Sequence, residues 1–92
     1  MLIEKFIEYL RVEKNYSNHT ITAYKTDLNN FNDFLIQSGT KTKIENIDYK
    51  VIRSWIVKMV NDNISNRTIN RKVSSLKSFY KFLIKTDTIK SS

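Results

Sequence analysis

The side chains of this sequence that could do chemistry are concentrated between positions 65 and 85. Basic, amide and hydroxyl residues recur there every three or four positions, which places them on one face of an α-helix. Arginine and lysine neutralise phosphate groups, and short polar side chains let a helix come close to a groove of a nucleic acid. The pattern therefore predicts a phosphate-binding helix face made of Arg67, Asn70, Arg71, Ser74, Lys77, Ser78 and Lys81.

The net charge of the chain is unevenly distributed. The 92 residues carry a formal charge of +7 at pH 7. Residues 64–92 hold seven lysines and arginines against a single acid, Asp87, so this last third of the chain accounts for nearly all of the excess. Charge gathered in one segment favours a polyanion bound there. An ordinary lysine-rich, solvated surface is the alternative that composition leaves open.

A second group of candidate contacts lies at the start of a predicted helix that follows Ser17. The free amides and the positive end of the helix dipole lie at that end, which suits an anion. Acids occur only on later turns of the predicted outer surface, at Asp27 and Asp33. We therefore expect a polyanion to contact the first turns alone, through His19, Thr20, Thr22 and Lys25.

Catalytic and metal-binding constellations are not recognisable in the sequence. There is no cysteine and one histidine, which rules out thiolate ligands, disulfides and a histidine-rich metal site. One glycine cannot build a phosphate-cradling loop, and no serine has the spacing to His19 and an acid that a triad needs. Tyr24 and Tyr80 fall in apolar stripes. We expect no catalytic residue, metal or cofactor in this chain.

Four helices are predicted to position the candidate residues. With no proline and only Gly39 as glycine, few and long helices are more plausible than many short strands. Apolar periodicity predicts helices over residues 2–13, 18–38, 49–61 and 66–85. Ser17, Asp48 and Ser65 are the expected N-caps, and residues 40–46 are expected to be a loop.

The apolar stripes of these helices predict an all-α, four-helix bundle. The expected core consists of Phe6, Leu10, Tyr24, Leu28, Phe31, Trp55, Ile56, Met59, Leu76 and Tyr80. Val60 is predicted on the inner face of the third helix. Phe82 falls near the edge of the polar face of the fourth, where it could pack on a linker, on a neighbouring protomer, or in the core at the helix end. Residues 1–86 are interpreted as one domain, and residues 87–92 as the start of a linker or a frayed tail. No apolar run is long enough to span a membrane, and the N-terminus does not resemble a secretory signal, so a cytoplasmic protein is expected.

Two blocks of the sequence resemble the N-terminal core-binding domain of tyrosine recombinases, the phage-integrase and Xer-like family. The first block, residues 6–35, has the family's Ser-x-x-Thr turn followed by Tyr-x-x-Asp-Leu, here Ser17, Thr20, Tyr24, Asp27 and Leu28. The second block, residues 64–83, follows the family pattern with Ser65, Thr68, Ile69, Arg71, Lys72, Ser74, Leu76, Lys77, Phe79, Tyr80, Phe82 and Leu83. The two blocks stand in the family's order and cover nearly the whole chain.

This resemblance implies a SAM-like, four-helix orthogonal bundle that forms half of a clamp around double-stranded DNA at a recombination half-site. The second and fourth helices would face the DNA. The implied partners are the duplex, a catalytic domain of the same parent chain, and other recombinase protomers in a synaptic complex. The catalytic residues and the tyrosine nucleophile would lie in that other domain, so this fragment would not itself be an enzyme.

Two other functions are compatible with parts of the sequence. A helix-turn-helix transcription regulator would need two short helices joined by a tight turn, whereas the fourth predicted helix is long and has a full apolar stripe. A helical protein-interaction domain would be expected to expose an apolar groove rather than a basic face.

Overall fold

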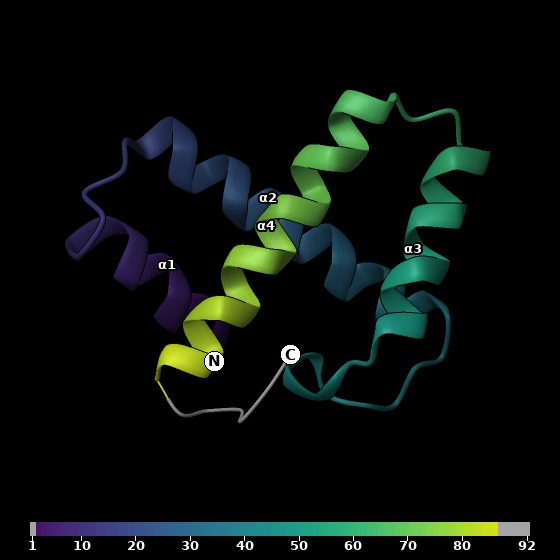
Figure 1. The fold of residues 1–92 in the computed structure, drawn as a ribbon, viewed down its shortest axis with the longest axis horizontal. Coiled ribbons are helices and arrows are strands. Elements are labelled where there is room, and N and C mark those ends of the chain that lie inside the picture. Colours follow the sequence, from purple (N-terminus) through teal and green to yellow (C-terminus); the bar gives the residue numbers. More distant parts are fainter. Residues whose placement is uncertain (1, 87–92) are drawn as a thin grey trace.

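The computed structural model describes residues 2–86, which form four α-helices and one short 3-10 helix (Figure 1). Their bounds are α1 Leu2–Val12, α2 Asn18–Gln37, η1 Ile44–Asn46, α3 Tyr49–Asn61 and α4 Asn66–Lys85. The predicted all-α, four-helix architecture is confirmed. The predicted linker or tail, residues 87–92, lies outside the described residues.

Each of the three later helices begins at the N-cap that the sequence predicts. The Ser17 hydroxyl accepts a hydrogen bond from the amide of Thr20 at 3.3 Å. The Ser65 hydroxyl accepts from the amide of Thr68 at 3.2 Å, so α2 and α4 start with the same Ser-x-x-Thr device. An Asp48 carboxylate oxygen accepts from the amide of Val51 at 3.2 Å. Each cap satisfies an amide that the helix itself cannot pair.

Left-handed residues follow the ends of the first three helices. Asn15, Gly39 and Asn63 have φ angles of 53°, 73° and 63°. After α2, the amide of Thr40 donates to the carbonyl of Leu35 at 2.9 Å, a Schellman arrangement that pairs a terminal carbonyl. These reversals, combined with the short connections, allow successive helices to fold back on one another.

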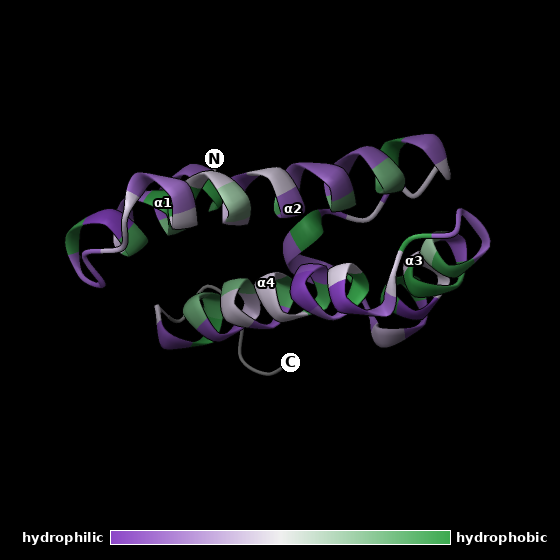
Figure 2. Cartoon of the chain, turned by 90° about the horizontal axis from the view of Figure 1, so that it is seen from above, coloured by the Kyte–Doolittle hydropathy of each residue, from purple (hydrophilic) through white to green (hydrophobic). Residues whose placement is uncertain are grey.

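The helices form two layers with the core between them. Seen from above, α1 and α2 lie in one layer and α3 and α4 in the other, with apolar residues turned toward the space between (Figure 2). The last helix, α4, crosses α2 near the middle of both helices (Figure 1) and also packs against α1 and α3. It is therefore the element that joins the two layers.

Aromatic rings fill the core at both ends of this arrangement. The ring of Phe6 contacts the rings of Phe79 and Phe82 at centroid distances of 5.5 and 5.4 Å. At the other end the Phe31 and Trp55 rings are 4.9 Å apart. Most of the predicted core residues are buried, the exceptions being Tyr24 and Ile56, which are half-buried at its edge.

Two local predictions are wrong, and for Phe82 the structure selects one of the expected alternatives. Phe82 packs in the core, because α4 is covered by α1 as well as by α2 and α3. Val60, expected inside, is 53% exposed, because α3 packs chiefly on α4 and buries only a narrow stripe. Residues 44–46 form the 3-10 helix η1 within the expected loop. Ile44 and Ile47 on either side pack against the core and hold this segment in place.

Candidate nucleic-acid interface

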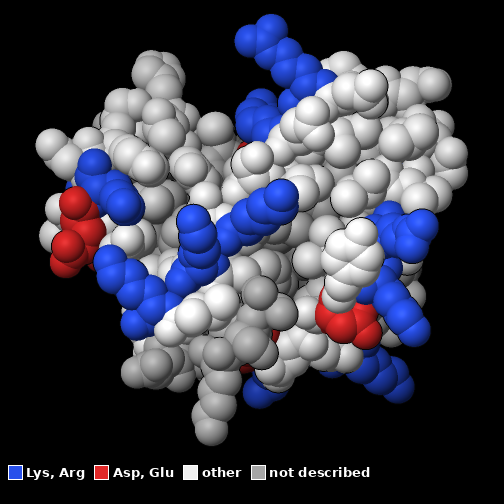
Figure 3. Space-filling model, viewed as in Figure 1, with Lys and Arg blue, Asp and Glu red and all other residues white. Residues whose placement is uncertain are grey.

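The polar face of α4 is exposed along its length. Among the predicted contacts on this helix, Ser78 is half-buried, and the exposed ones are Arg67, Asn70, Arg71, Ser74, Lys77 and Lys81. On the side of the molecule that carries α4, lysine and arginine side chains lie in a band with few carboxylates beside it (Figure 3). The charge asymmetry of the sequence is therefore a surface feature of this side.

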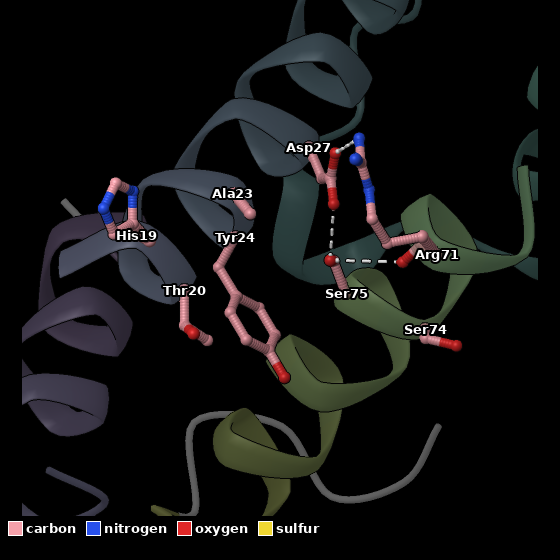
Figure 4. A pocket seen from close by; sticks show the side chains of 8 residues that line it. All are labelled: His19, Thr20, Ala23, Tyr24, Asp27, Arg71, Ser74 and Ser75. Carbon is pink, nitrogen blue, oxygen red and sulfur yellow. Dashed lines mark hydrogen bonds and ion pairs between the residues drawn. The ribbon is translucent and has the colours of Figure 1, made fainter. Parts of the chain in front are cut away.

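A shallow hollow of about 390 Å³ lies between the first turns of α2 and the N-terminal half of α4 (Figure 4). We call it the α2–α4 hollow; its lining residues are His19, Thr20, Ala23, Tyr24, Asp27, Arg71, Ser74 and Ser75. It brings two predicted contacts from α2, His19 and Thr20, next to two from α4, Arg71 and Ser74. The remaining predicted contacts, Thr22, Lys25, Arg67, Asn70, Lys77, Ser78 and Lys81, lie outside it.

Asp27 forms the floor of this hollow, although the sequence pattern predicts it on the outer surface of α2. It is only 1% exposed. Its Oδ1 accepts from Arg71 Nη2 at 2.9 Å and from Lys72 Nζ at 3.4 Å, and its Oδ2 accepts from the Ser75 hydroxyl at 2.8 Å. A carboxylate buried without partners would be very costly, and these three donors from α4 offset that cost.

The same contacts divide the basic residues of α4 into two kinds. Lys72 is buried, with only 8% of its surface exposed, and is occupied by Asp27 and Asn30. Arg71 is paired with Asp27, yet 54% of its side chain remains exposed. Lys77 is exposed and has no acidic partner among residues 2–86. Arg71 and Lys77, which look equivalent in the sequence, therefore differ in charge compensation and in freedom to move.

A signal for the buried Asp27 is present in the sequence. Asp27 falls three residues after Tyr24 and four before Phe31, within the apolar stripe of α2, and Lys72 and Ser75 fall within that of α4. A carboxylate in one apolar stripe and a cation in another predict a buried pair if the two helices cross. The crossing itself cannot be read from either helix alone.

A second hollow, which we call the α1–α4 hollow, adjoins the C-terminal half of α4 and holds about 410 Å³. Its lining residues are Phe6, Tyr9, Leu10, Lys14, Tyr16, Tyr24, Ser78, Lys81, Phe82 and Lys85. Tyr24 lines both hollows and stacks on Tyr16 with 6.1 Å between ring centroids. Ser78 and Lys81 thus belong to a cationic and aromatic surface that includes Lys14 and Lys85, two lysines that helix periodicity did not single out.

Tyr80 is a structural residue of α4. It is 9% exposed, which confirms its predicted place in the core, and its hydroxyl donates to the carbonyl of Ile44 at 2.6 Å. Burial raises the pKa of the Tyr80 phenol well above its usual range, and the nearby charge of Glu45 adds to this increase. The phenol is therefore neutral at physiological pH, and its hydrogen bond to Ile44 connects η1 to α4.

Neither a metal site nor a membrane span is found in the described part of the chain. Within residues 2–86, no three or more histidine, aspartate or glutamate side chains gather closely enough to hold a metal ion. None of the helices in this range combines the length and the apolar character that crossing a membrane requires.

Comparison with known proteins gives consistent matches. The family described as Phage integrase, N-terminal SAM-like domain, matches residues 3–87. The tyrosine recombinase XerC of Rickettsia felis is 39% identical over 94 residues, which cover 98% of this chain and 31% of that protein. XerC of Oceanobacillus iheyensis is 41% identical over 83 residues, covering 90% of this chain and 27% of that protein. The chain thus spans less than a third of the length of these relatives, and no solved structure matches it.

Proposed function

The chain belongs to the phage integrase N-terminal SAM-like domain family, and on that premise we propose that it is the DNA-binding, core-binding domain of a site-specific tyrosine recombinase. In this proposal the domain forms half of a clamp on the duplex of a recombination half-site. The cleavage and joining of DNA strands would belong to a catalytic domain elsewhere in the parent chain. Other recombinase protomers would be partners in a synaptic complex, and the site of action would be the cytoplasm.

One observation carries the DNA-binding part of this proposal. The first turns of α2 and the polar face of α4 meet at the α2–α4 hollow, and side chains from both helices line it. The walls include Thr20, Ala23 and Ser74, whose small size would let a duplex come close to both helices. Helix N-termini and cationic side chains are common sources of contacts to phosphate.

The proposed contacts fall into two groups by position. Arg67, Lys77 and Lys81 on α4 and Lys25 on α2 are exposed and would neutralise phosphates. His19, Thr20, Arg71 and Ser74 line the hollow and would meet the duplex where the two helices converge. Asn70, Ser78 and Thr22 complete the proposed surface as polar neighbours of these groups.

The test is the salt dependence of duplex binding. The 92-residue chain would be titrated into a fluorescently labelled duplex at several salt concentrations, and the logarithm of the affinity plotted against the logarithm of the salt concentration. Replacing Lys77 and Lys81 by alanine should weaken binding and reduce the slope by about 0.9 for each phosphate that is no longer neutralised. The matched control is Lys50→Ala, which removes one exposed lysine from α3.

Two results would contradict parts of the proposed function. No binding to any duplex at low salt would contradict the DNA-binding function. Binding that Lys50→Ala weakens as much, per lysine, as the α4 double variant does would mean that α4 does not form the interface.

A further inference from the structure

We propose that Arg71 reads a guanine base in the major groove of the bound duplex, and that the buried Asp27 is the positioning residue that aims it. This inference rests on the proposed DNA-binding function and adds a specificity-determining contact to it. It departs from the sequence-based expectation that Arg71, like the lysines of α4, neutralises a phosphate.

The Arg71 guanidinium is held at one edge and open at the other. Its Nη2 donates to Asp27 Oδ1 at 2.9 Å, while 54% of the side chain remains exposed to solvent. Arg71 is also one of the residues that line the α2–α4 hollow. Figure 4 shows the guanidinium beside the Asp27 carboxylate at the edge of that hollow. A guanidinium has five N–H donors in a rigid plane, so the bond to Asp27 leaves others for a ligand.

The Asp27 carboxylate cannot readily turn away from Arg71. Its other oxygen accepts from the Ser75 hydroxyl at 2.8 Å, and the single hydrogen of that hydroxyl is shared with the backbone carbonyl of Arg71 at 3.2 Å. Lys72 supplies a second cation from the same helix. An arginine whose anchor is itself locked has already given up much of its rotational freedom, so binding reduces its entropy less.

The charge around Arg71 favours a base over a phosphate as its ligand. The negative charge of Asp27 already compensates part of the positive charge of Arg71 and Lys72, which makes Arg71 a poor neutraliser of the DNA backbone. A planar donor pair held in a fixed orientation suits instead the O6 and N7 acceptors of guanine. The small side chains of Ala23 and Ser74 beside it leave room for a base edge.

The experiment is a selection from a library of DNA duplexes with a randomised central segment, sequenced after binding to the 92-residue chain. Arg71→Ala should remove the preference for guanine at one position, by about tenfold or more, and change the salt slope little. Lys77→Ala is the matched control, because it removes an uncompensated cation from the same helix. It should reduce the salt slope and leave the preference intact.

Asp27→Asn tests the positioning role. Asparagine retains the size of the side chain but places an amide group, itself a donor, next to the three donors of α4. The guanidinium of Arg71 is then no longer held in one orientation. The preference should fall at the same position as in Arg71→Ala. Affinity for unselected duplex should stay equal or rise, because an acid next to the DNA has been removed. A merely structural role for Asp27 would lower affinity and preference together, and that result would overturn the positioning claim.

Ser75→Ala serves if Asp27→Asn does not fold, as judged by circular dichroism. It removes the 2.8 Å bond to Asp27 without changing any charge and should lower the same preference to a smaller extent. No change would overturn the positioning claim. If Arg71→Ala lowers the affinity for all DNA sequences equally and reduces the salt slope, Arg71 contacts phosphate. This inference then fails, while the proposed function stands. If wild-type protein binds no duplex, the proposed function has failed first.

Discussion

The two halves of α4 are joined to the rest of the molecule by opposite kinds of contact. In the N-terminal half, Arg71, Lys72 and Ser75 all donate hydrogen bonds to one buried carboxylate on α2. In the C-terminal half, Phe79 and Phe82 pack their rings against Phe6 of α1. One continuous helix thus has a polar attachment at one end and an aromatic one at the other.

This difference shows how stability and geometry are divided along the helix. Burial of apolar rings is strongly stabilising but weakly directional. A buried ion pair gains little net stability because of the cost of desolvating its charges, yet its hydrogen bonds require defined positions of both partners. The aromatic half would therefore supply most of the stability, and the polar half would set how α2 and α4 meet at the proposed DNA surface.

The largest effect should come from the aromatic half. Phe79 is fully buried, and Phe79→Ala should lower the free energy of unfolding by about 3–5 kcal/mol, because apolar burial is reduced and a cavity is left. Urea denaturation followed by circular dichroism measures this change. The control is Val60→Ala at an exposed position of α3, which should cost about 0.5 kcal/mol or less. Similar destabilisation of both variants would contradict the assignment of the aromatic core.

Removing the buried carboxylate of the polar half should lower the free energy of unfolding less than Phe79→Ala does. Replacing the ion pair by an apolar pair should restore most of that stability. Asp27→Ala leaves Lys72 buried beside Asn30 and should cost about 3 kcal/mol, because an uncompensated charge remains. The double variant Asp27→Leu with Lys72→Met should recover most of that stability, since an apolar pair needs no partner. If the double variant is as unstable as Asp27→Ala, the network contributes net stability and the contrast between the two halves is weaker than we infer.

Tyr80 tests a polar contact in the aromatic half. Tyr80→Phe removes the 2.6 Å hydrogen bond to Ile44 and should cost about 1 kcal/mol at pH 7. Because burial raises the pKa of Tyr80, the unfolded chain loses this proton first, near pH 10. Wild-type stability should therefore fall as the pH rises above about 10, and the gap to Tyr80→Phe should narrow. Denaturation of both proteins between pH 7 and 11 gives the comparison; a constant gap would mean that the phenol is not buried.

The smallest effect should come from the end of α4. Lys85 Nζ lies 5.2 Å from the centre of the Tyr9 ring, a cation–π contact at an exposed site. A double-mutant cycle with Lys85→Ala and Tyr9→Leu should give a coupling of about 0.5–1 kcal/mol. A coupling near zero would show that the two side chains do not interact in solution.

The helices could be predicted from the sequence because each depends on neighbours a few residues apart. Ser17, Asp48 and Ser65 cap amides three residues away, and Gly39 ends α2 where only a left-handed residue fits. The buried network at Asp27 could not be predicted in the same way. Its partners are 44–48 residues away, and only the crossing of α2 and α4 brings them together.

For the candidate site, the helix faces could be predicted from the sequence, but the contacts between them could not. His19, Thr20, Arg71 and Ser74 converge on one hollow, as two separate helix faces suggest. Arg71 and Lys77 look alike in the sequence, because periodicity shows which side chains share a helix face but not which residues of another helix they contact. The pattern leaves the place of Phe82 open for a related reason: α1 covers a side of α4 that the periodicity of α4 alone marks as the border of the polar face.

The contact of Phe6 with Phe79 and Phe82 has a consequence for how the domain is made. Synthesis proceeds from the N-terminus, so α1, α2 and α3 leave the ribosome before α4, the helix that packs against all three, exists. Until α4 emerges, Phe6 lacks the rings of Phe79 and Phe82, and the carboxylate of Asp27 lacks its three hydrogen-bond donors. We therefore expect the domain to fold late in its own translation, in a single step once α4 is available, with its nascent apolar surfaces open to chaperones until then.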